Sequence, residues 1–213
     1  MKILAFIWLA VPALLQGQLG VQGSFYVGQA DHRVRDAGVL VPASGAVFGG
    51  ALTANVGPRF TIAAEGMSGH FTAASGASLD DHDIAQLQLI GGMKVRPWLT
   101  VQAGPLWRNV SNDLARQHWT ALRVGGEARV PIGFESVRGV LRGYWMPLVS
   151  VSGLSRPDVA LAASAGVEWR GRRIGLGTRY VLERYDFPVT AGNSRSEEFA
   201  ALQAWVSASW SKP

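Results

Sequence analysis

Residues 159–169 read VALAASAGVEW, the clearest case of alternation between apolar and polar positions in the chain. Apolar side chains occupy every second position from Val159 to Trp169, and small or polar ones, such as Ser164 and Glu168, lie between them. An alternation with period two places one face of an extended strand in apolar surroundings and the other in polar surroundings. The stretch therefore predicts a β-strand with two unlike faces.

The same alternation recurs in residues 85–95, 122–130 and 137–145. Between these stretches lie tight-turn signals, marked by Gly57, Arg96, Gly133 and Gly171. The four markers are separated by 39, 37 and 38 residues, so a near-constant hairpin period runs along the chain. Each period accommodates two strands and one longer polar connection.

The longer connections are predicted at residues 35–45, 72–82, 111–117, 150–157 and 187–197, where Asp, Asn, Ser and Gly gather. This arrangement gives ten antiparallel strands, or eight if the first and last hairpins are misassigned. Four short turns then lie on one side and five longer loops on the other. Short periplasmic turns and longer outer loops are typical of bacterial outer-membrane barrels. The predicted fold is therefore an all-β, transmembrane, up-and-down β-barrel.

Residues 1–20 have the layout of a secretory signal peptide. Lys2 precedes an apolar run from Ile3 to Leu15, and small and polar residues follow. The run is shorter than the roughly 20 apolar residues that a spanning helix needs. We therefore expect residues 1–20 to be removed after export, with Gly17 and Gly20 as alternative last residues, and residues 21–213 to form the barrel.

The composition excludes several classes of function. The chain has no cysteine, which rules out disulfides, thiolate metal sites, cysteine nucleophiles and a lipidated N-terminal cysteine. The net charge is +5 and comes almost entirely from arginine. The arginines are scattered and no recognition helix is visible, so nucleic acid is not expected as a partner. No cofactor or metal is predicted.

Aromatic residues cluster at the two ends of the predicted strands. Two rings of aromatic side chains are typical of a barrel that crosses a membrane. The ring at the turn end is predicted to contain Phe60, Trp98, Phe134, Trp169 and Trp210. The ring at the loop end is predicted to contain Trp107, Trp119, Trp145, Tyr185 and Phe187. A water-soluble barrel would alternate in the same way, but the signal peptide, these rings and the unequal loops favour the membrane.

The last strand, residues 199–210, reads FAALQAWVSASW and alternates up to Trp210. In this feature and in its architecture the chain resembles the small outer-membrane β-barrel proteins of Gram-negative bacteria, over residues 21–213. The resemblance implies location in the outer membrane, contact with its lipid and lipopolysaccharide, and recognition of the last strand by the barrel assembly machinery. Three further residues follow Trp210, where members of this class usually end on the aromatic residue.

Strand parity sends a set of charged side chains into the barrel. The predicted lumen network consists of Glu65, Lys94, Arg108, Arg123, Glu127, Arg129, Arg138, Arg142, Glu168, Arg179 and Glu183. One interpretation is a filled polar interior in which Arg and Glu satisfy each other, because unpaired buried charge is costly. The other is a narrow porin-like channel that favours small anionic solutes.

A second candidate site lies at the outer end of the predicted fourth strand, at Asp80, Asp81, His82 and Asp83. Asp31, His32 and His70 are expected nearby. Carboxylates beside histidine can activate water or hold a divalent cation. Asp81 and Asp83 are similar in form to the Asp-x-Asp pair of the ten-stranded outer-membrane proteases called omptins, although the predicted outer loops are too short for their deep cleft. The alternative is a solvated acidic loop.

Three functions follow from these patterns. The first is a non-enzymatic outer-membrane protein with a structural or surface-interaction role and a largely filled lumen. The second is the narrow anion channel, and the third is an outer-membrane hydrolase at the acidic cluster. The sequence leaves the choice among them, the ligand and the oligomeric state open.

Overall fold

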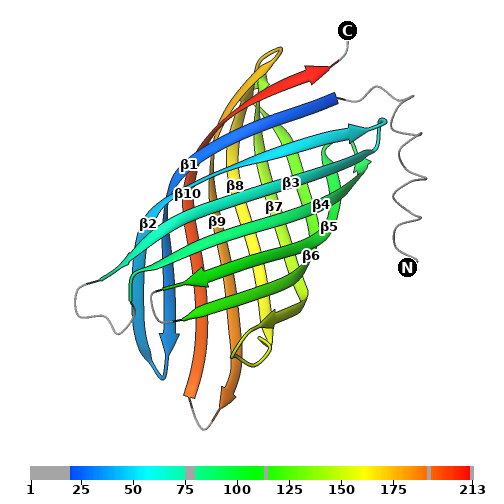
Figure 1. Cartoon of the computed structure of the whole chain (residues 1–213). Coiled ribbons are helices and arrows are strands. Elements are labelled where there is room, and N and C mark those ends of the chain that lie inside the picture. The colour runs from blue at the N-terminus through cyan, green and yellow to red at the C-terminus, as the bar shows by residue number, and fades with distance from the viewer. Residues whose placement is uncertain (1–19, 75–79, 113–114, 191–192, 212–213) are drawn as a thin grey trace, which may run out of the picture.

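In the computed structural model, the described residues 20–74, 80–112, 115–190 and 193–211 form ten antiparallel strands that close into a barrel (Figure 1). The strands are β1 (Gly20–Asp36), β2 (Val39–Val56), β3 (Phe60–Ala73), β4 (His82–Arg96), β5 (Leu99–Ser111), β6 (Arg116–Ile132), β7 (Phe134–Val151), β8 (Val159–Arg170), β9 (Ile174–Thr190) and β10 (Asn193–Ser211). The all-β up-and-down barrel and the ten strands are therefore confirmed. Of the expected signal peptide, residues 1–19 lie outside the described residues, and Gly20 begins β1.

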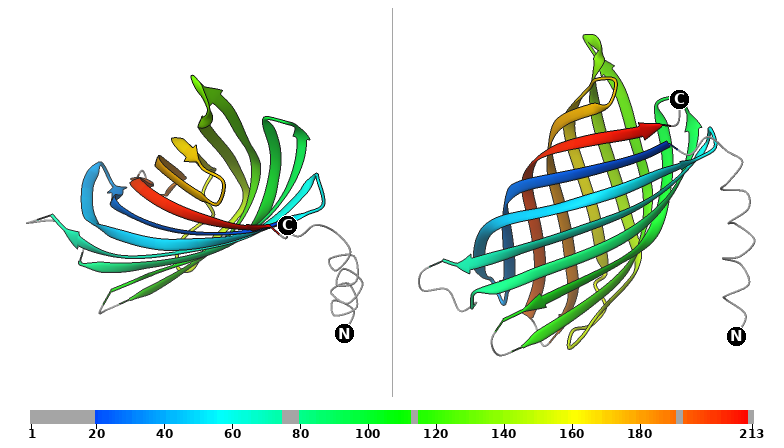
Figure 2. Two further views of the ribbon diagram at one scale, coloured as in Figure 1. Left: turned by 90° about the horizontal axis from the view of Figure 1, so that it is seen from above. Right: turned by 45° about the horizontal axis from the view of Figure 1, so that its top comes forward.

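Each strand pairs with its neighbours in the sequence, and β1 pairs with β10 to close the barrel. This seam is continuous from Gly20 opposite Ser211 to Asp36 opposite Arg195. The strands are inclined to the barrel axis (Figure 2). None of the described residues forms a helix long and apolar enough to cross a membrane.

The four short turns lie where the sequence predicts them. They comprise residues 57–59, 97–98, Gly133 and 171–173. Gly57 and Gly133 have φ of 69° and 72°, a conformation that glycine adopts without steric cost. We call this the turn end of the barrel, and the opposite end the outer end.

At the outer end, two of the five predicted long loops are wrong. β1 and β2 stay paired up to Asp36 and Val39, so only Ala37 and Gly38 connect them. These two residues have φ of 48° and 83°, as in the type I′ turn that joins tightly paired strands. β9 likewise continues to Thr190 and β10 begins at Asn193. Polar side chains on extended strands have the same composition as a loop, which explains the error for residues 35–45 and 187–197.

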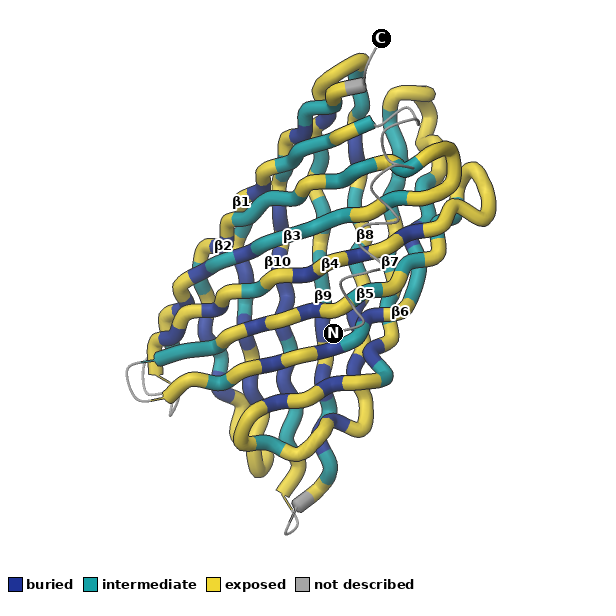
Figure 3. The backbone as a smooth tube through the Cα atoms, turned by 45° about the vertical axis from the view of Figure 1, so that its right-hand side comes forward, coloured by how far each residue is buried: buried dark blue, intermediate teal, exposed yellow. Residues whose placement is uncertain are grey.

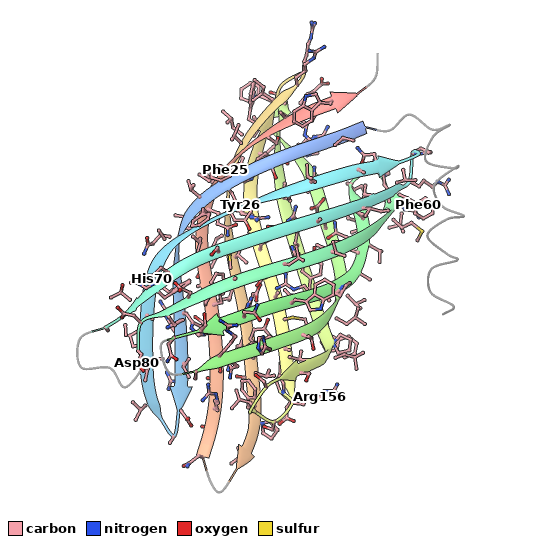
Figure 4. All side chains as sticks on the ribbon, viewed as in Figure 1. Phe25, Tyr26, Phe60, His70, Asp80 and Arg156 are labelled. Carbon is pink, nitrogen blue, oxygen red and sulfur yellow. The ribbon has the colours of Figure 1, made fainter. Side chains whose placement is uncertain are left out.

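The other three connections comprise residues 74–81, 112–115 and 152–158. Buried and exposed positions alternate along the strands (Figure 3). On β1, for example, Phe25 is 53% exposed on the outer face, whereas the neighbouring Tyr26 is 3% exposed inside the barrel (Figure 4). Parity therefore divides every strand into an inward and an outward face.

The polarity of these faces changes along the barrel axis. In the first half of β1 the outward side chains Val21, Phe25 and Val27 are apolar and the inward Gln22 and Ser24 are polar. In the second half the relation is reversed. The outward side chains are now Asp31, Arg33 and Arg35, and the inward ones include Ala30 and Val34. The turn-end half thus has an apolar outer face, and the outer half has an apolar interior.

Candidate functional site

The interior of the barrel contains three successive layers. At the turn end lies a polar cavity of about 280 Å³, which we call the vestibule. A layer of paired charges follows, and an apolar layer fills the outer half. The eleven residues of the predicted lumen network all lie on the inner side of the wall, from the buried Glu183 to Lys94 at the turn end.

The charged layer is centred on Glu183 of β9. Its carboxylate accepts hydrogen bonds from Arg108 of β5 and Arg123 of β6, and a third from the Tyr185 hydroxyl at 3.0 Å. The β9 strand pairs only with β8 and β10, so these two ion pairs cross the lumen. Within the described residues, the Nε of Arg123 is the only buried side-chain polar atom without a hydrogen-bond partner.

Two glutamines extend this layer along β4. The side-chain oxygen of Gln86 accepts a hydrogen bond from Arg108 Nε at 2.9 Å, and that of Gln88 accepts one from Arg123 at 2.6 Å. The amide of Gln88 in turn donates to Glu65 at 2.9 Å. Five side chains from β4, β5, β6 and β9 are thereby connected to β3.

Nearer the turn end, Glu65 pairs with Arg179 at 2.5 Å, again across the lumen. Glu127 accepts hydrogen bonds from Arg129 and Arg142, both at 2.6 Å. The side chains therefore meet from opposite walls at two levels. These ion pairs occupy the middle of the lumen.

The apolar layer above the charges consists of two clusters. One contains Trp119, Tyr185 and Phe187, with the Trp119 and Tyr185 ring centroids 4.9 Å apart. The other contains Phe71, which is fully buried, and Phe199, with ring centroids 6.1 Å apart. Aromatic pairs at such distances stabilise the fold by more than the burial of their surface area alone.

This layer corrects the predicted outer aromatic ring. Trp119, Tyr185 and Phe187 were expected to face lipid, but they are 3%, 2% and 6% exposed inside the barrel. These three residues lie an even number of positions from Arg123 or Glu183, which were predicted to point inward. The same spacing could therefore have predicted that they point inward too. The remaining predicted ring members are exposed at the two ends: Phe60, Trp98, Phe134, Trp169 and Trp210 at the turn end, and Trp107 and Trp145 towards the outer end.

The acidic cluster at the start of β4 is divided between the two faces. His82 points inward, is 4% exposed and stacks on Phe71. Asp83 points outward and hydrogen-bonds His70 at 2.8 Å, near the outer end in Figure 4. Asp81 accepts a hydrogen bond from the backbone of Ala73 at 2.9 Å.

The carboxylates of this cluster consequently do not converge on one point. Asp31 also faces outward, where it pairs with Arg33 at 3.1 Å, while His32 beside it faces inward. In the part of the chain that the structure describes, no group of three His, Asp or Glu side chains is arranged to hold a metal ion. Asp81 and Asp83 therefore do not form with His82 the single site that the hydrolase interpretation assumes.

A smaller pocket of about 170 Å³ lies at the outer mouth. There His32 Nδ1 is 2.9 Å from His82 Nε2, and His32 Nε2 is 3.6 Å from a carboxylate oxygen of Glu197. Arg195 donates a hydrogen bond to Glu197 at 2.6 Å. The sequence did not identify Arg195 and Glu197 as site residues, because they fall in the segment 187–197 that was taken as a loop.

The pKa values of two groups in this pocket are lowered, for different reasons. Desolvation lowers the pKa of His82, because it disfavours the charged imidazolium. Burial opposes ionisation of Glu197 as well, but His32 and Arg195 outweigh it and lower the pKa of this carboxyl group. At neutral pH the pocket therefore holds a neutral His82 and an ionised Glu197.

The charges are distributed unequally between the two ends. Among the described residues, the turn end has two carboxylates, Glu135 and the buried Glu168, against Arg59, Lys94, Arg96, Arg138, Arg170, Arg172 and Arg173. Carboxylates predominate at the outer end, where Asp31, Asp36, Asp80, Asp81, Asp83, Asp158, Asp186, Glu197 and Glu198 accompany Arg33, Arg35, Arg116, Arg156, Arg184 and Arg195. One end of the barrel is therefore basic and the other acidic.

No protein-family model matches the sequence, and no curated protein matches it. Solved structures that align with the chain include the translocator domain of the autotransporter NalP from Neisseria meningitidis, with 15% identity, coverage of 96% of this chain and 93% of that chain, and a TM-score of 0.44. An outer membrane channel from Pseudomonas putida F1 aligns with 14% identity, 91% and 96% coverage and a TM-score of 0.48. Neisserial surface protein A aligns with 11% identity, 89% and 96% coverage and a TM-score of 0.39. At these values the similarities assign no activity to the chain.

Proposed function

We propose that the chain is a closed integral barrel of the Gram-negative outer membrane whose projecting outer end takes part in interactions at the cell surface. The observation that carries the proposal is the reversal of polarity along the barrel axis. The turn-end half has an apolar outer face and a polar interior, as expected for a wall in contact with lipid. The outer half has a polar outer face and an apolar interior, as expected for a wall in contact with water.

The dimensions of the apolar outer face support the membrane assignment. On β8, the outward residues Val159, Leu161, Val167 and Trp169 are all exposed, and together they extend over most of the strand. A tilted strand of about ten residues crosses the hydrocarbon core of an outer membrane. In water such a band would be a very large apolar patch, which soluble monomers rarely expose.

The filled interior supports a closed barrel over a channel. Glu183 and Glu65 each pair with an arginine on the opposite wall, and Phe71, Trp119 and Tyr185 fill the lumen above them. An ion would have to pass both the charged and the apolar layer. The remaining role is therefore at the surface, where β1, β9 and β10 present polar outward side chains such as Arg33, Arg184 and Glu198.

The contacts with lipopolysaccharide and with the barrel assembly machinery that the sequence suggests are part of this proposal. Trp107 and Trp145 are exposed where the apolar band meets the polar outer wall. Aromatic side chains prefer such a boundary between lipid and water. The alternating end of β10, up to Trp210, is available on the outer face for recognition during assembly.

Conductance in a planar bilayer tests the closed barrel. The refolded full chain should give no discrete current steps, while its heat-dependent shift in gel electrophoresis shows that it is folded. A matched variant, Phe71→Ala combined with Trp119→Ala, empties the apolar layer but retains the charged layer, and should also remain silent. Reproducible steps in the unmodified protein would contradict the proposal and favour the anion channel.

Site-specific labelling tests the placement in the cell. The chain has no cysteine, so a single introduced one reports unambiguously. In intact cells, Arg35→Cys on the outer face of β1 should react with a membrane-impermeant maleimide. Arg172→Cys in the turn between β8 and β9 should react only after the cells are broken. Labelling of Arg172→Cys in intact cells would show that the orientation is wrong.

A further inference from the structure

We infer that the vestibule is a binding site for a small anionic solute, with a phosphate or carboxylate group, that enters from the turn end. Residues Pro97 and Trp98 of the turn between β4 and β5 border the cavity, so it opens at this end. The inference rests on the proposed function in one respect: if the barrel is closed, the solute leaves by the way it entered. The vestibule is then a blind receptor site facing the periplasm.

The cavity wall carries more positive than negative charge. Its cationic side chains are Lys94, Arg129, Arg138, Arg142, Arg170 and Arg179. Only Glu65, Glu127 and Glu168 oppose them. Glu65 is engaged by Arg179, and Glu127 by Arg129 and Arg142. Neither Lys94 nor Arg138 forms an ion pair with any carboxylate of the described residues, which leaves positive charge uncompensated in the cavity.

The excess is greatest around Glu168. Arg129 and Arg170 lie 3.4 Å and 3.3 Å from the same carboxylate oxygen, and Arg138 is the residue opposite Glu168 on the neighbouring strand. Two guanidinium groups thus share one carboxylate oxygen, and a third arginine without an ion pair lies on the neighbouring strand. Such a grouping is electrostatically unfavourable until another anion joins it. Guanidinium groups match phosphate and carboxylate in geometry, because they donate two parallel hydrogen bonds.

The rest of the lining fits a polar solute of limited size. Hydroxyl and amide side chains, such as Thr100 and Gln102, supply hydrogen-bonding groups, and Trp98 and Trp205 supply apolar surface. The cavity volume of about 280 Å³ lies just below the usual range of roughly 300–1,000 Å³ for ligand sites. We therefore expect a solute of about the size of a sugar phosphate, not a polymer or a whole lipid.

The surroundings of the cavity favour the approach of an anion. Arg59, Arg96, Arg172 and Arg173 are exposed in or next to the turns at this end, and Glu135 is the one exposed carboxylate there among the described residues. A rim of one sign of charge raises the local concentration of the opposite ion and accelerates its association. The basic rim and the basic cavity therefore both favour the binding of an anion.

Titration calorimetry on the folded full chain in a nonionic detergent tests the site. The probes are inorganic phosphate and glucose 6-phosphate, with glucose as the neutral control. Glucose 6-phosphate should bind saturably, whereas glucose should not. The variant Arg138→Gln should bind about tenfold more weakly, because it loses a charge-assisted contact. Arg138 has no ion pair to lose, so this variant should still fold, which the gel shift verifies.

Arg35→Gln is the matched control, since it removes the same charge at the outer end and should bind like the unmodified protein. Equal affinity of Arg138→Gln and the unmodified protein would overturn the inference, as would the absence of saturable binding. Repeating the titration in phosphatidylcholine vesicles with and without phosphatidylglycerol separates the two sources of phosphate. Loss of glucose 6-phosphate binding when phosphatidylglycerol is present would assign the site to a lipid headgroup instead. A conducting barrel would refute the closed lumen without changing this titration.

Discussion

The turn-end half and the outer half of the barrel have opposite distributions of polarity on most strands, whereas β8 keeps apolar outward residues from Val159 to Trp169. In the turn-end half the interior holds Glu65, Glu127 and their arginine partners, and the outer face is apolar. In the outer half the interior holds Phe71, Trp119 and Tyr185, and the outer face is polar. The interior of a closed sheet can therefore be polar at one height and apolar at another. What surrounds the wall at each height determines which face is apolar.

The largest expected effect concerns the charge at the centre of the interior. Glu183→Gln leaves the buried Arg108 and Arg123 without their ionised partner. Breaking a buried ion pair in this way costs about 3–5 kcal/mol of unfolding free energy. Urea unfolding in detergent micelles, followed by the gel shift, measures this cost.

The matched control is Glu198→Gln on the polar outer face, where Glu198 pairs with Arg33 at 3.3 Å. Exposed pairs of this kind contribute less than about 1 kcal/mol. If both variants lost the same stability, the charged layer would not be the buried network described here.

The next effect tests the apolar interior of the outer half. Phe71→Ala removes a fully buried ring that contacts His82 and Phe199. The cavity and the lost transfer free energy should cost about 3–4 kcal/mol. The same unfolding assay applies, and Phe25→Ala on the lipid-facing side of β1 serves as a comparison. A loss below about 1 kcal/mol for Phe71→Ala would mean that the outer half is not held together by its interior.

A somewhat smaller effect tests the outer faces directly. Leu52 and Ser44 both face outward on β2, in the apolar band and in the polar outer part respectively. Leu52→Arg should cost about 2–4 kcal/mol, as for arginine near the middle of a bilayer. Ser44→Arg should be close to neutral. Unfolding measured in phospholipid vesicles compares the two, and equal costs would contradict the reversal of polarity along β2.

The smallest effect is a pH dependence at the outer mouth. Burial lowers the pKa of His82 below its ordinary value of 6.5, so the folded state resists protonation there. The unfolding free energy should therefore be highest above about pH 6.5 and decline as the pH falls below it. The other titratable and charged groups of the same region modulate this decline. They are His32, Asp80, Asp81, Asp83, Arg195 and Glu197.

Glu197 titrates in a separate window. Its pKa is lowered from 4.5, so the stability that it contributes is present above that pH and is lost as the pH falls through the lowered value. Measuring unfolding between pH 5 and 8 excludes the contribution of Glu197, and His82→Gln should reduce the decline in that interval. An unchanged decline in this variant would assign the pH dependence to other groups.

The strand alternation and the hairpin period predicted most of the fold, since the short turns at Gly57 and Gly133 are defined by local chemistry. The outer loops were predicted less well. Residues 35–45 contain Asp36 and Gly38, which are equally suited to a loop and to a tight turn between long polar strands. Composition cannot distinguish these two, because both are exposed to water.

The candidate site, like the outer loops, could be predicted from the sequence only in part. Parity alone sends Arg123 and Glu183 inward, and it equally sends Trp119 and Tyr185 inward. The two aromatic residues were assigned to lipid because the outer face was expected to be apolar along the whole strand. The pairing of Glu183 with two arginines from distant strands could not be predicted, since it depends on which walls of the closed barrel face each other.

The seam between β1 and β10 has a consequence for how the barrel forms in time. Its partners lie near opposite ends of the chain, from Gly20 opposite Ser211 to Asp36 opposite Arg195. Contacts between residues so far apart in the sequence form slowly, because the intervening chain must be ordered first. Until the seam closes, both edge strands expose unpaired backbone groups that a bilayer does not tolerate. We therefore expect spontaneous refolding to be slow and cooperative, with closure of the seam as its last step.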